Sequence, residues 1–428
     1  MNATTGVRHG KVPRRSWQIA WLLGVGVLVN YFDRVNLSVS HEALIGTFAI
    51  SNVMFGYLSG AYNWTYALCQ LPIGVLLDRW GVRRVGRIGT LLWSVASFAG
   101  AAAPGIPALF SARLLLGVGE APTFPANAKA VGLWFPARAR GLATALFDSA
   151  AKFASALGVP LLGAVLLAVG WRWSFALTGL VSLLFFGVFW KVYCDPADDT
   201  TLTAEERQVI EEPVAGEPAG TEYSLGWLLK QRKVLGFTLG FAAYNYVFYF
   251  LLTWLPSYLS MVLHVDLMHS FLYTSVPWLV ATVTDLAVGG WLVDALIARG
   301  LDASRVRRTV LIAGTACGLG ILGAAGAHTA REALVWISVS LGGLSAAAPV
   351  GWSVPSLIAP RGGVGRVGGI LNFSNQLNGI AAPIVTGYLF QAQHYAWAFG
   401  VAGGYVVVGI AAYLLLLGRI EPVTARAT

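Results

Sequence analysis

The sequence contains few charged residues and almost no cysteine. Charged side chains make up 11% of its 428 residues, whereas hydrophobic side chains make up 56% and the mean hydropathy is +0.66. Few soluble proteins combine these values. The three cysteines, Cys69, Cys194 and Cys317, are isolated and have no metal-binding or redox spacing. We therefore expect no metal site and no cofactor.

Long apolar runs fill most of the chain. A helix needs about 20 mostly apolar residues to cross a bilayer. The 50 glycines are typical of closely packed membrane helices, because small residues let two backbones approach each other. The sequence predicts an all-α membrane protein with twelve transmembrane helices in two pseudo-symmetric six-helix bundles. The predicted spans are 17–38, 52–77, 85–103, 107–128, 139–168, 172–193, 233–262, 268–297, 308–328, 333–358, 364–391 and 395–418.

Basic residues lie mainly on one side of the predicted membrane. They precede the first span and follow the second, fourth, eighth, tenth and twelfth spans, whereas the opposite loops hold little beyond Arg172 and Arg331. By the positive-inside rule, this asymmetry places both termini in the cytoplasm. The net charge of +9 therefore reflects topology and does not indicate a nucleic-acid partner. We expect a multi-pass protein of the bacterial inner membrane.

The two halves of the chain repeat a pattern. A polar segment divides it into a bundle over residues 1–193, a central cytoplasmic loop over 194–231 and a second bundle over 232–428. In the loop, Thr203 and Glu206 have capping-box spacing, which predicts a short surface helix ending near Pro213. A small residue followed by an acid recurs at the ends of the second and eighth spans. We expect a gating role there, with capped helix ends as the alternative, for Gly74, Asp78, Arg79, Gly290 and Asp294.

The first and the fourth predicted spans carry four charged residues between them. Each costs roughly 2.5–3.5 kcal/mol at the centre of a bilayer helix. Arg113 and Glu120 share one helix face about 10 Å apart, with Gly117 expected to keep the space between them open. Asp33 and Arg34 are expected level with Arg113, so that two guanidinium groups clamp one carboxylate. A purely structural ion-pair network is the alternative, but intramembrane charges usually mark a transport pathway.

A second polar set lies on the fifth and eighth spans. Asp148 and Lys152 stand one turn apart on one helix, and Asp285 lies at a similar depth in the eighth span. We expect Lys152 between the two carboxylates, as an interdomain latch or as a further contact for an anion. The alternative is a neutral pair hidden at the interface, with Asp285 protonated.

The C-terminal half carries groups that suit hydroxyl recognition. Phenols and amides cluster on the seventh and eleventh spans, and an indole lies on the tenth. They fit a polyhydroxylated substrate better than a planar aromatic one. Hydrogen bonding between helices is the alternative, although it contributes only about 0.6 kcal/mol per pair in membranes. The residues are Tyr244, Asn245, Tyr246, Tyr249, Trp352, Ser353, Asn372, Asn375, Gln376 and Asn378.

Several strings of residues resemble those of a known transporter family. GVLLDRWGVRR at 74–84, the two sets of six spans and the central loop resemble the major facilitator superfamily. NYFDRVNLS at 30–38, YALCQLP at 66–72, RLLLGVGEAPTFPAN at 113–127 and WFP at 134–136 resemble its anion:cation symporter family. That family includes bacterial galactonate, hexuronate, glucarate, tartrate and phthalate transporters. The likeness runs nearly from end to end.

The resemblance implies roles for the intramembrane charges. Asp33 and Glu120 match the proton-coupling acids of the family. Arg34 and Arg113 match residues that serve the substrate carboxylate and its coupling to protons.

The resemblance also bears on the substrate. Tyr31, Tyr66 and Asn372 match positions that line the galactonate site. Ala151, beside Lys152, stands where the galactonate transporter has a glutamine, and Gly351 stands where a threonine is expected. These departures leave the exact substrate open within the class.

The sequence thus predicts a proton-coupled symporter that imports small organic anions by alternating access. Sugar acids (aldonates, hexuronates or aldarates) lead the substrates, and the expected partners are the anion, protons and the lipid bilayer, with the protein acting as a monomer. An anion or phosphate exchanger without proton coupling and an efflux transporter are the alternatives. No nucleophile–base pair or phosphate loop indicates an enzyme. The expected substrate contacts are Arg34, Arg113, Tyr31, Tyr66, Asn372, Asn245, Trp352, Gln376 and Lys152.

Overall fold

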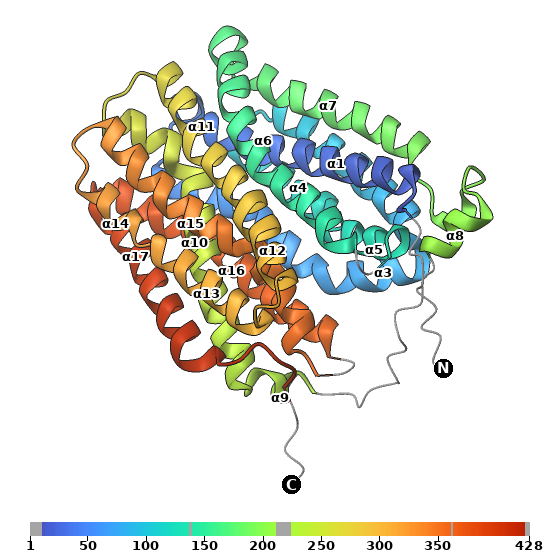
Figure 1. Ribbon diagram of the computed structural model, residues 1–428. Helices are drawn as coiled ribbons and strands as arrows, with labels where there is room; N and C mark the ends of the chain where they lie inside the picture. The colour runs from blue at the N-terminus through green and yellow to red at the C-terminus, as the bar shows by residue number, and fades with distance from the viewer. Residues whose placement is uncertain (1–10, 137–138, 211–223, 361–362, 424–428) are drawn as a thin grey trace, which may run out of the picture.

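The described part of the chain is almost entirely helical. The computed structural model describes residues 11–136, 139–210, 224–360 and 363–423, and every regular element within these ranges is a helix. The helices form two bundles that lie side by side (Figure 1). The predicted all-α fold of two bundles is confirmed.

The first bundle comprises α1 to α7. The short helix α2 was not predicted, and it meets the first part of α3 at an angle of 118°. The other helices match predicted spans with the changes described below. The bounds are α1 (Arg14–Val39), α2 (His41–Phe48), α3 (Asn52–Ala101), α4 (Ile106–Glu120), α5 (Thr123–Trp134), α6 (Arg140–Val169) and α7 (Trp171–Val192).

The element α3 consists of two helices joined at Gly81. Gly81 has φ 73° and ψ 171°, a backbone conformation that essentially only glycine adopts. The predicted spans 52–77 and 85–103 are both present, but they meet at Gly81 instead of being separated by a loop. Hydropathy does not report backbone angles, so the sequence pattern placed a loop where the chain turns at one residue.

The fourth span is broken, and it is longer than predicted. The helix α4 ends at Glu120, and α5 begins at Thr123 and continues to Trp134, whereas the predicted span ended at residue 128. Pro122 and Pro125 have no N–H group to donate to a continuous helical ladder. The two prolines account for the break, which falls directly after the buried Glu120.

The linker between the bundles contains η2 (Pro196–Asp198), α8 (Ala204–Ile210) and α9 (Leu225–Leu229). The predicted capping box at the start of α8 is confirmed. The Thr203 hydroxyl accepts from the Glu206 N–H at 3.2 Å, and the Glu206 carboxylate accepts from the Thr203 N–H at 3.0 Å. Pro213, the expected end of this helix, lies outside the described residues, and the boundaries 194 and 231 remain a prediction.

Asp199 joins this linker to the start of α1. Its carboxylate accepts hydrogen bonds from Arg15 Nε at 2.8 Å and from the backbone N–H of Thr201 at 2.8 Å. Burial opposes ionisation of Asp199, but the hydrogen bonds outweigh it and hold the pKa of the carboxyl well below its ordinary value. The ion pair therefore stabilises the folded chain wherever Asp199 is ionised.

We expect Asp199→Asn to lower the melting temperature of the purified protein in detergent by a few degrees at pH 7. A carboxyl whose pKa is depressed by folding stabilises above its unfolded pKa, near 3.8, and this contribution is lost as the pH falls below that value. The difference between variant and wild type should therefore shrink on acidification below about pH 4. Asp198→Asn is the control, because the Asp198 side chain is 62% exposed. Equal melting temperatures at pH 7 would contradict this assignment.

The second bundle comprises α10 to η4. Its eighth span is continuous but contains a π-helical stretch, η3, that begins at Asp285. Such stretches are rare and are frequent at functional sites. The bounds are α10 (Arg232–Met261), α11 (Leu267–Thr284), η3 (Asp285–Leu292), α12 (Val293–Ala298), α13 (Ala303–Cys317), α14 (Gly320–Ala325), α15 (Ala330–Ile358), α16 (Val364–Gln391), α17 (Tyr395–Ala412) and η4 (Tyr413–Leu417).

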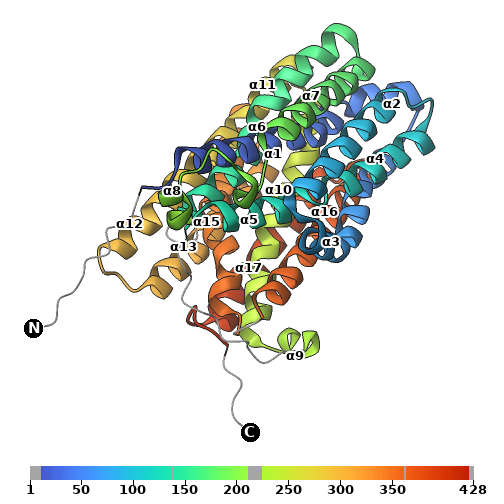
Figure 2. The same cartoon turned by 90° about the vertical axis from the view of Figure 1, so that its right-hand side faces the viewer.

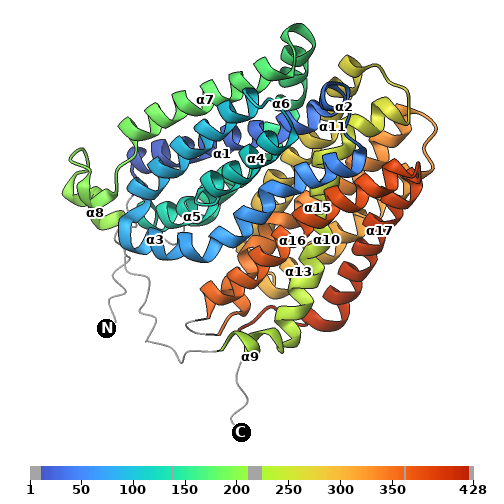
Figure 3. The same cartoon turned by 180° about the vertical axis from the view of Figure 1, so that it is seen from behind.

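The bundles touch at one end of the molecule and separate at the other, and α3 and α16 follow this path side by side (Figure 2, Figure 3). A Cβ atom on Gly56 would lie 2.6 Å from the Pro383 carbonyl oxygen, so the two backbones are in contact there. Further along the same helices, Gly74 and Gly369 have no atom within 4 Å of the position of a Cβ. We call the first end the closed end and the second the open end.

The outer surface of the bundles is suited to lipid. Within the described residues, seven helices are long and apolar enough to cross a membrane, and α2 with the first part of α3 forms a bent pair that also qualifies. Large apolar side chains are exposed on the outside, among them Leu68 at 77%, Trp291 at 71% and Leu415 at 71%. The helices α1, α4 and α16 are outside the seven, and they supply charged and amide residues to the interior.

Candidate functional site

A cavity of about 290 Å³ lies between the two bundles. It is close to the lower end of the size of ligand pockets, about 300–1,000 Å³. The helices α1, α3, α5 and α6 of the first bundle and α10, α15 and α16 of the second supply its walls. We call it the central cavity, and it is lined by Tyr31, Arg34, Tyr66, Phe124, Pro125, Ala128, Thr144, Phe147, Asp148, Ala151, Lys152, Tyr244, Asn245, Phe248, Tyr249, Trp352, Asn372, Asn375 and Gln376.

Arg34 is the cation of α1 that reaches the central cavity. It is 7% exposed, and its Nε donates to Glu120 Oε2 at 3.0 Å. Its Nη2 donates to Asn30 Oδ1 at 2.9 Å, one helical turn away. The guanidinium carbon lies 4.3 Å from the ring centre of Tyr31 and 4.6 Å from that of Tyr62. Arg34 is thus held by a buried carboxylate and two aromatic faces, with one side on the cavity.

The two acids predicted to couple protons, Glu120 and Asp33, are buried inside the first bundle. Glu120 is 0% exposed, and apart from its contact with Arg34 its Oε1 has no hydrogen-bond partner among the described residues. Asp33 is 3% exposed and accepts hydrogen bonds from Ser97 at 2.7 Å and from Ser182 at 3.1 Å. Neither acid lines the central cavity. Glu120 is linked to the cavity by its hydrogen bond with Arg34, whereas Asp33 faces the interior of the first bundle.

Arg113 does not line the central cavity in this conformation. Its Nη1 donates to the Asp33 backbone carbonyl at 3.3 Å, and its Nε has no partner among the described residues. With Arg34 and Asn63 it lines a separate polar space of about 20 Å³ on the side of the closed end, which is large enough for one water molecule. The two arginines share this small space, but only Arg34 reaches the central cavity. A joint clamp on a substrate carboxylate therefore remains a prediction.

The expected role of Gly117 is wrong. It was expected to keep space open between Arg113 and Glu120, but a Cβ at this position would lie 2.2 Å from the Tyr62 carbonyl oxygen and 2.3 Å from Thr65 Oγ1. The absent side chain lets α4 pack directly on α3. The open space lies elsewhere, between the bundles.

Several predicted substrate contacts from both bundles come together on the central cavity. Tyr31, Tyr66, Asn372, Asn245, Trp352, Gln376 and Lys152 all line it. Two polar atoms of this set are buried and have no hydrogen-bond partner in the described part of the chain, the Trp352 indole N–H and the Gln376 carbonyl oxygen. Buried polar groups are normally paired. The unpaired donor and the unpaired acceptor thus both belong to side chains that line the same cavity, and neither is satisfied by the described part of the protein.

The structure brings Asp148, Lys152 and Asp285 together. Lys152 Nζ lies 2.6 Å from Asp148 Oδ2 and 2.7 Å from Asp285 Oδ2. The second contact joins α6 of the first bundle to the start of η3 in the second. Asp148 and Lys152 line the central cavity, whereas Asp285 is 0% exposed.

The residues predicted to act as gates lie apart in this conformation. Asp78 pairs with Lys129 at 2.7 Å, inside the first bundle, and a Cβ on Gly74 or Gly290 would have no neighbour from the other bundle within 4 Å. Within the described ranges, Arg79 and Asp294 make no ion pair across the bundles. These positions are at the open end, where the bundles have separated, so their predicted role concerns another conformation.

Sequence reasoning missed residues that shape the charged sites. Tyr62 covers Arg34 with its ring, and Asn30 holds the same guanidinium. Lys129 binds both the Asp78 carboxylate and the Leu77 carbonyl oxygen. The four-residue spacing of Asn30 and Arg34 was a readable signal, because such residues share one face of a helix. The contacts of Tyr62 and Lys129 join different helices and leave no local signal.

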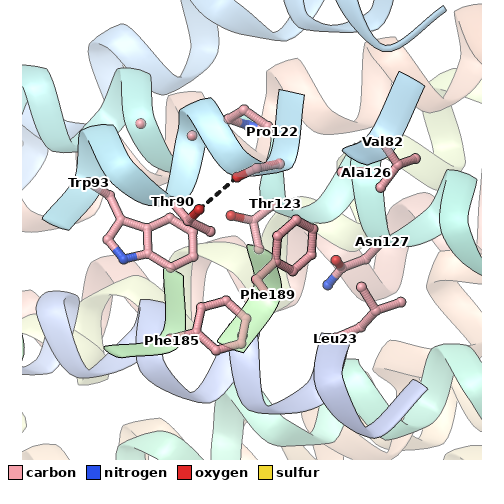
Figure 4. A pocket seen from close by; sticks show the side chains of 14 residues that line it. Leu23, Val82, Thr90, Trp93, Pro122, Thr123, Ala126, Asn127, Phe185 and Phe189 are labelled. Atoms are coloured by element: carbon pink, nitrogen blue, oxygen red, sulfur yellow. Dashed lines mark hydrogen bonds between the residues drawn. The ribbon is translucent and has the colours of Figure 1, made fainter. Parts of the chain in front are cut away.

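A smaller pocket inside the first bundle is not a second site for an organic anion (Figure 4). It measures about 30 Å³ and lies among α1, α3, α4, α5 and α7. Its walls are mainly apolar, with Trp93, Phe185 and Phe189 prominent, and Thr90 donates back to the Gly86 carbonyl at 2.9 Å. The space accommodates water and not a carboxylate with its carbon chain. In the described ranges, no group of three His, Cys, Asp or Glu side chains is placed to hold a metal ion.

Comparison with known proteins identifies the family. The model of the Major Facilitator Superfamily matches residues 23–302. The chain belongs to this superfamily. It is 40% identical to the uncharacterized transporter YybO of Bacillus subtilis (strain 168), over 95% of this chain and 94% of that protein. It is 31% identical to the D-galactonate transporter of Escherichia coli O6:H1 (strain CFT073), over 97% of this chain and 99% of that protein.

The fold comparison agrees with this assignment. A bacterial homologue of the human lysosomal transporter Spinster, solved in an inward-facing and occupied conformation, superposes with a TM-score of 0.73 at 17% identity, over 95% of this chain and 97% of that one. The protein is therefore a multi-pass membrane transporter of this superfamily and not an enzyme, as the sequence predicted.

Proposed function

We propose that the protein is a proton-coupled symporter that imports sugar acids across the bacterial inner membrane. One observation carries the proposal: Arg34 faces the central cavity while its other side is paired with the buried Glu120. This arrangement gives an anion a cation to bind and links that binding to a titratable acid. The similarity to a transporter named for D-galactonate supports a sugar acid as the substrate.

The substrate carboxylate binds at Arg34. A guanidinium offers several N–H donors in one plane and forms two parallel hydrogen bonds with a carboxylate. Cation–π contacts with Tyr31 and Tyr62 keep the group in place. In the low dielectric of a membrane protein, such a charge attracts an anion more strongly than it would in water.

The hydroxyl groups of the substrate bind on the second bundle. The unpaired Trp352 N–H is a donor and the unpaired Gln376 oxygen is an acceptor, and Asn372 adds an amide to the same wall. A hydroxyl group both donates and accepts. A chain of hydroxyls therefore satisfies groups that a hydrocarbon ligand would leave unpaired.

Proton coupling follows from competition for Arg34. Glu120 and a substrate carboxylate are both acceptors for one guanidinium, and a buried carboxylate without a partner is costly. A proton on Glu120 removes its charge and releases Arg34 to the substrate. Substrate and proton therefore bind together, and Asp33 provides a second acid in the same bundle.

Alternating access then carries both across the membrane. The positions of the basic loops support a cytoplasmic location for both termini and for the open end, and on this assignment the conformation faces inward. Rocking of one bundle on the other separates α3 from α16 at the closed end and brings the gate residues Gly74, Asp78 and Asp294 to the opposite bundle.

Glu120→Gln tests the coupling. A neutral amide in place of the carboxylate mimics protonated Glu120, so we expect substrate exchange across the membrane to continue while uphill accumulation driven by a pH gradient is lost. The measurement is radiolabelled sugar-acid uptake by purified protein in proteoliposomes, with and without a pH gradient and in counterflow. Glu205→Gln on the surface helix α8 is the matched control. Accumulation that stays at the wild-type level in Glu120→Gln would rule out this residue as the coupling acid, and uptake by wild type that ignores the gradient would favour an exchanger.

A further inference from the structure

Charged side chains on the wall of the central cavity bear on which sugar acids can bind there. We propose that Asp148, Lys152 and Asp285, here called the charge triad, select sugar acids with one carboxylate and reject those with two. This inference rests on the proposed function and refines its substrate class. An aldonate and its aldarate differ only at one end, where a hydroxymethyl group of the first is a carboxylate in the second.

Lys152 of the charge triad is already paired with carboxylates of the protein. Its Nζ lies 2.6 Å from one carboxylate oxygen and 2.7 Å from another, contributed by α6 and η3. Its side chain is 1% exposed. The centre of the Tyr244 ring lies 5.9 Å from Nζ. An incoming anion would have to displace a carboxylate from Lys152, so Lys152 is not a free anchor.

The acids of the triad outnumber its cation. Two carboxylates surround one ammonium group, and no other Lys or Arg pairs with Asp148 or Asp285 in the described part of the chain. Asp285 Oδ1 is buried without a hydrogen-bond partner among the same residues. This part of the wall therefore carries an excess of one negative charge when both acids are ionised, and none when one of them holds a proton.

The triad and Arg34 act on one ligand. Both Arg34 and the pair Asp148–Lys152 line the same cavity of about 290 Å³. Aromatic rings connect them. The Tyr31 ring centre lies 4.3 Å from the Arg34 guanidinium carbon, and the Tyr244 ring centre lies 5.9 Å from Lys152 Nζ. Both rings pack against Phe248, at centroid distances of 6.3 Å and 5.7 Å. A sugar acid held by its carboxylate at Arg34 thus presents its other end to the triad.

The identity of that other end decides whether binding is favourable. A hydroxyl group donates a hydrogen bond to the Asp148 carboxylate, which is an acceptor on the cavity surface. A second carboxylate has no proton to donate and meets like charge in a region of low dielectric. Arg34 anchors one acid group, and the triad repels another.

Neutralising the triad in steps tests the proposal. Asp148→Asn removes the excess negative charge, and Asp148→Asn with Asp285→Asn leaves Lys152 unpaired and the wall cationic. We measure inhibition of labelled uptake, and the thermal stabilisation of the purified protein, by galactonate against galactarate and by gluconate against glucarate. For wild type, we expect half-maximal inhibition to require at least a 10-fold higher concentration of the diacid than of the monoacid, in whichever of the two pairs binds better. This ratio of diacid to monoacid concentration falls toward one in Asp148→Asn. It drops below one in the double variant.

The graded series separates charge from structure. Ser155→Ala, on the same helix but away from the cavity, is the control and keeps the wild-type ratio. If Asp148→Asn does not fold, Asp285→Asn removes the same unit of charge and serves in its place. Equal affinity for both acids of the pairs in wild type, or a ratio that does not change with triad charge, would overturn the inference while leaving sugar-acid transport intact. Failure of every acid to bind would instead refute the proposed function itself.

Discussion

Arg34→Gln combined with Glu120→Gln abolishes substrate binding and uptake, whereas Glu120→Gln alone retains binding. Truncating one partner of a buried charge pair costs about 2–5 kcal/mol, so we expect affinity to fall by about 30-fold or more. The double variant is preferred to Arg34→Gln alone, because the single change would leave Glu120 buried without its cation. The measurement is equilibrium binding of a labelled sugar acid to purified protein, followed by uptake in proteoliposomes.

The control for this experiment is Arg14→Gln, at the exposed start of α1. It removes an arginine from the same helix without touching the cavity, so binding should remain at the wild-type level. Retention of binding by the Arg34 double variant would show that the anion is held elsewhere. The small polar space around Arg113 would then be the first alternative.

Gly56→Leu abolishes transport by preventing closure of the closed end. A Cβ at Gly56 would already lie 2.6 Å from the Pro383 carbonyl oxygen, so a leucine there forces α3 and α16 apart. The transporter is then expected to open at the end that is closed in this structure. The measurement uses a background in which Cys69, Cys194 and Cys317 are replaced by serine and Asn372 by cysteine, so that a membrane-impermeant thiol reagent reports which side reaches the cavity.

Two further substitutions make the Gly56 experiment interpretable. Gly46→Leu on α2 is the control, because a Cβ there has no atom within 4 Å. Gly74→Leu at the open end should act in the opposite sense, since it fits this conformation and obstructs closure of that end. We expect labelling of the cavity cysteine from the outside to rise in Gly56→Leu and to fall in Gly74→Leu. Equal labelling of both variants would argue against the rocking of α3 on α16.

Much of the fold could be read from the sequence because lipid imposes a simple requirement. A chain that crosses a bilayer must satisfy its backbone hydrogen bonds internally, so apolar runs of about 20 residues report helices directly. The turn at Gly81, the break at Pro122 and the π-helical stretch from Asp285 were not predicted. These features depend on backbone angles within helices. Hydropathy averaged over 20 residues is insensitive to such angles.

Only part of the candidate site could be predicted from the sequence, for a related reason. Arg34, Arg113 and Glu120 were recognisable because charge inside a membrane is costly. Their separation into a cavity-facing Arg34 and a buried Arg113 was not, because the two residues lie on different helices whose rotation is set by packing. Tyr62 shows the same limit, since its contact with Arg34 joins α3 to α1.

The sequence by itself determined that this protein is a helical transporter of two bundles with charge inside the membrane, because hydropathy and the cost of buried charge act residue by residue. Only the tertiary structure decided which charges meet. Arg34 with Glu120 and Lys152 with Asp285 are pairs formed between distant segments. Their geometry depends on how the helices pack and on which end of the molecule is closed, and neither is encoded in any single segment.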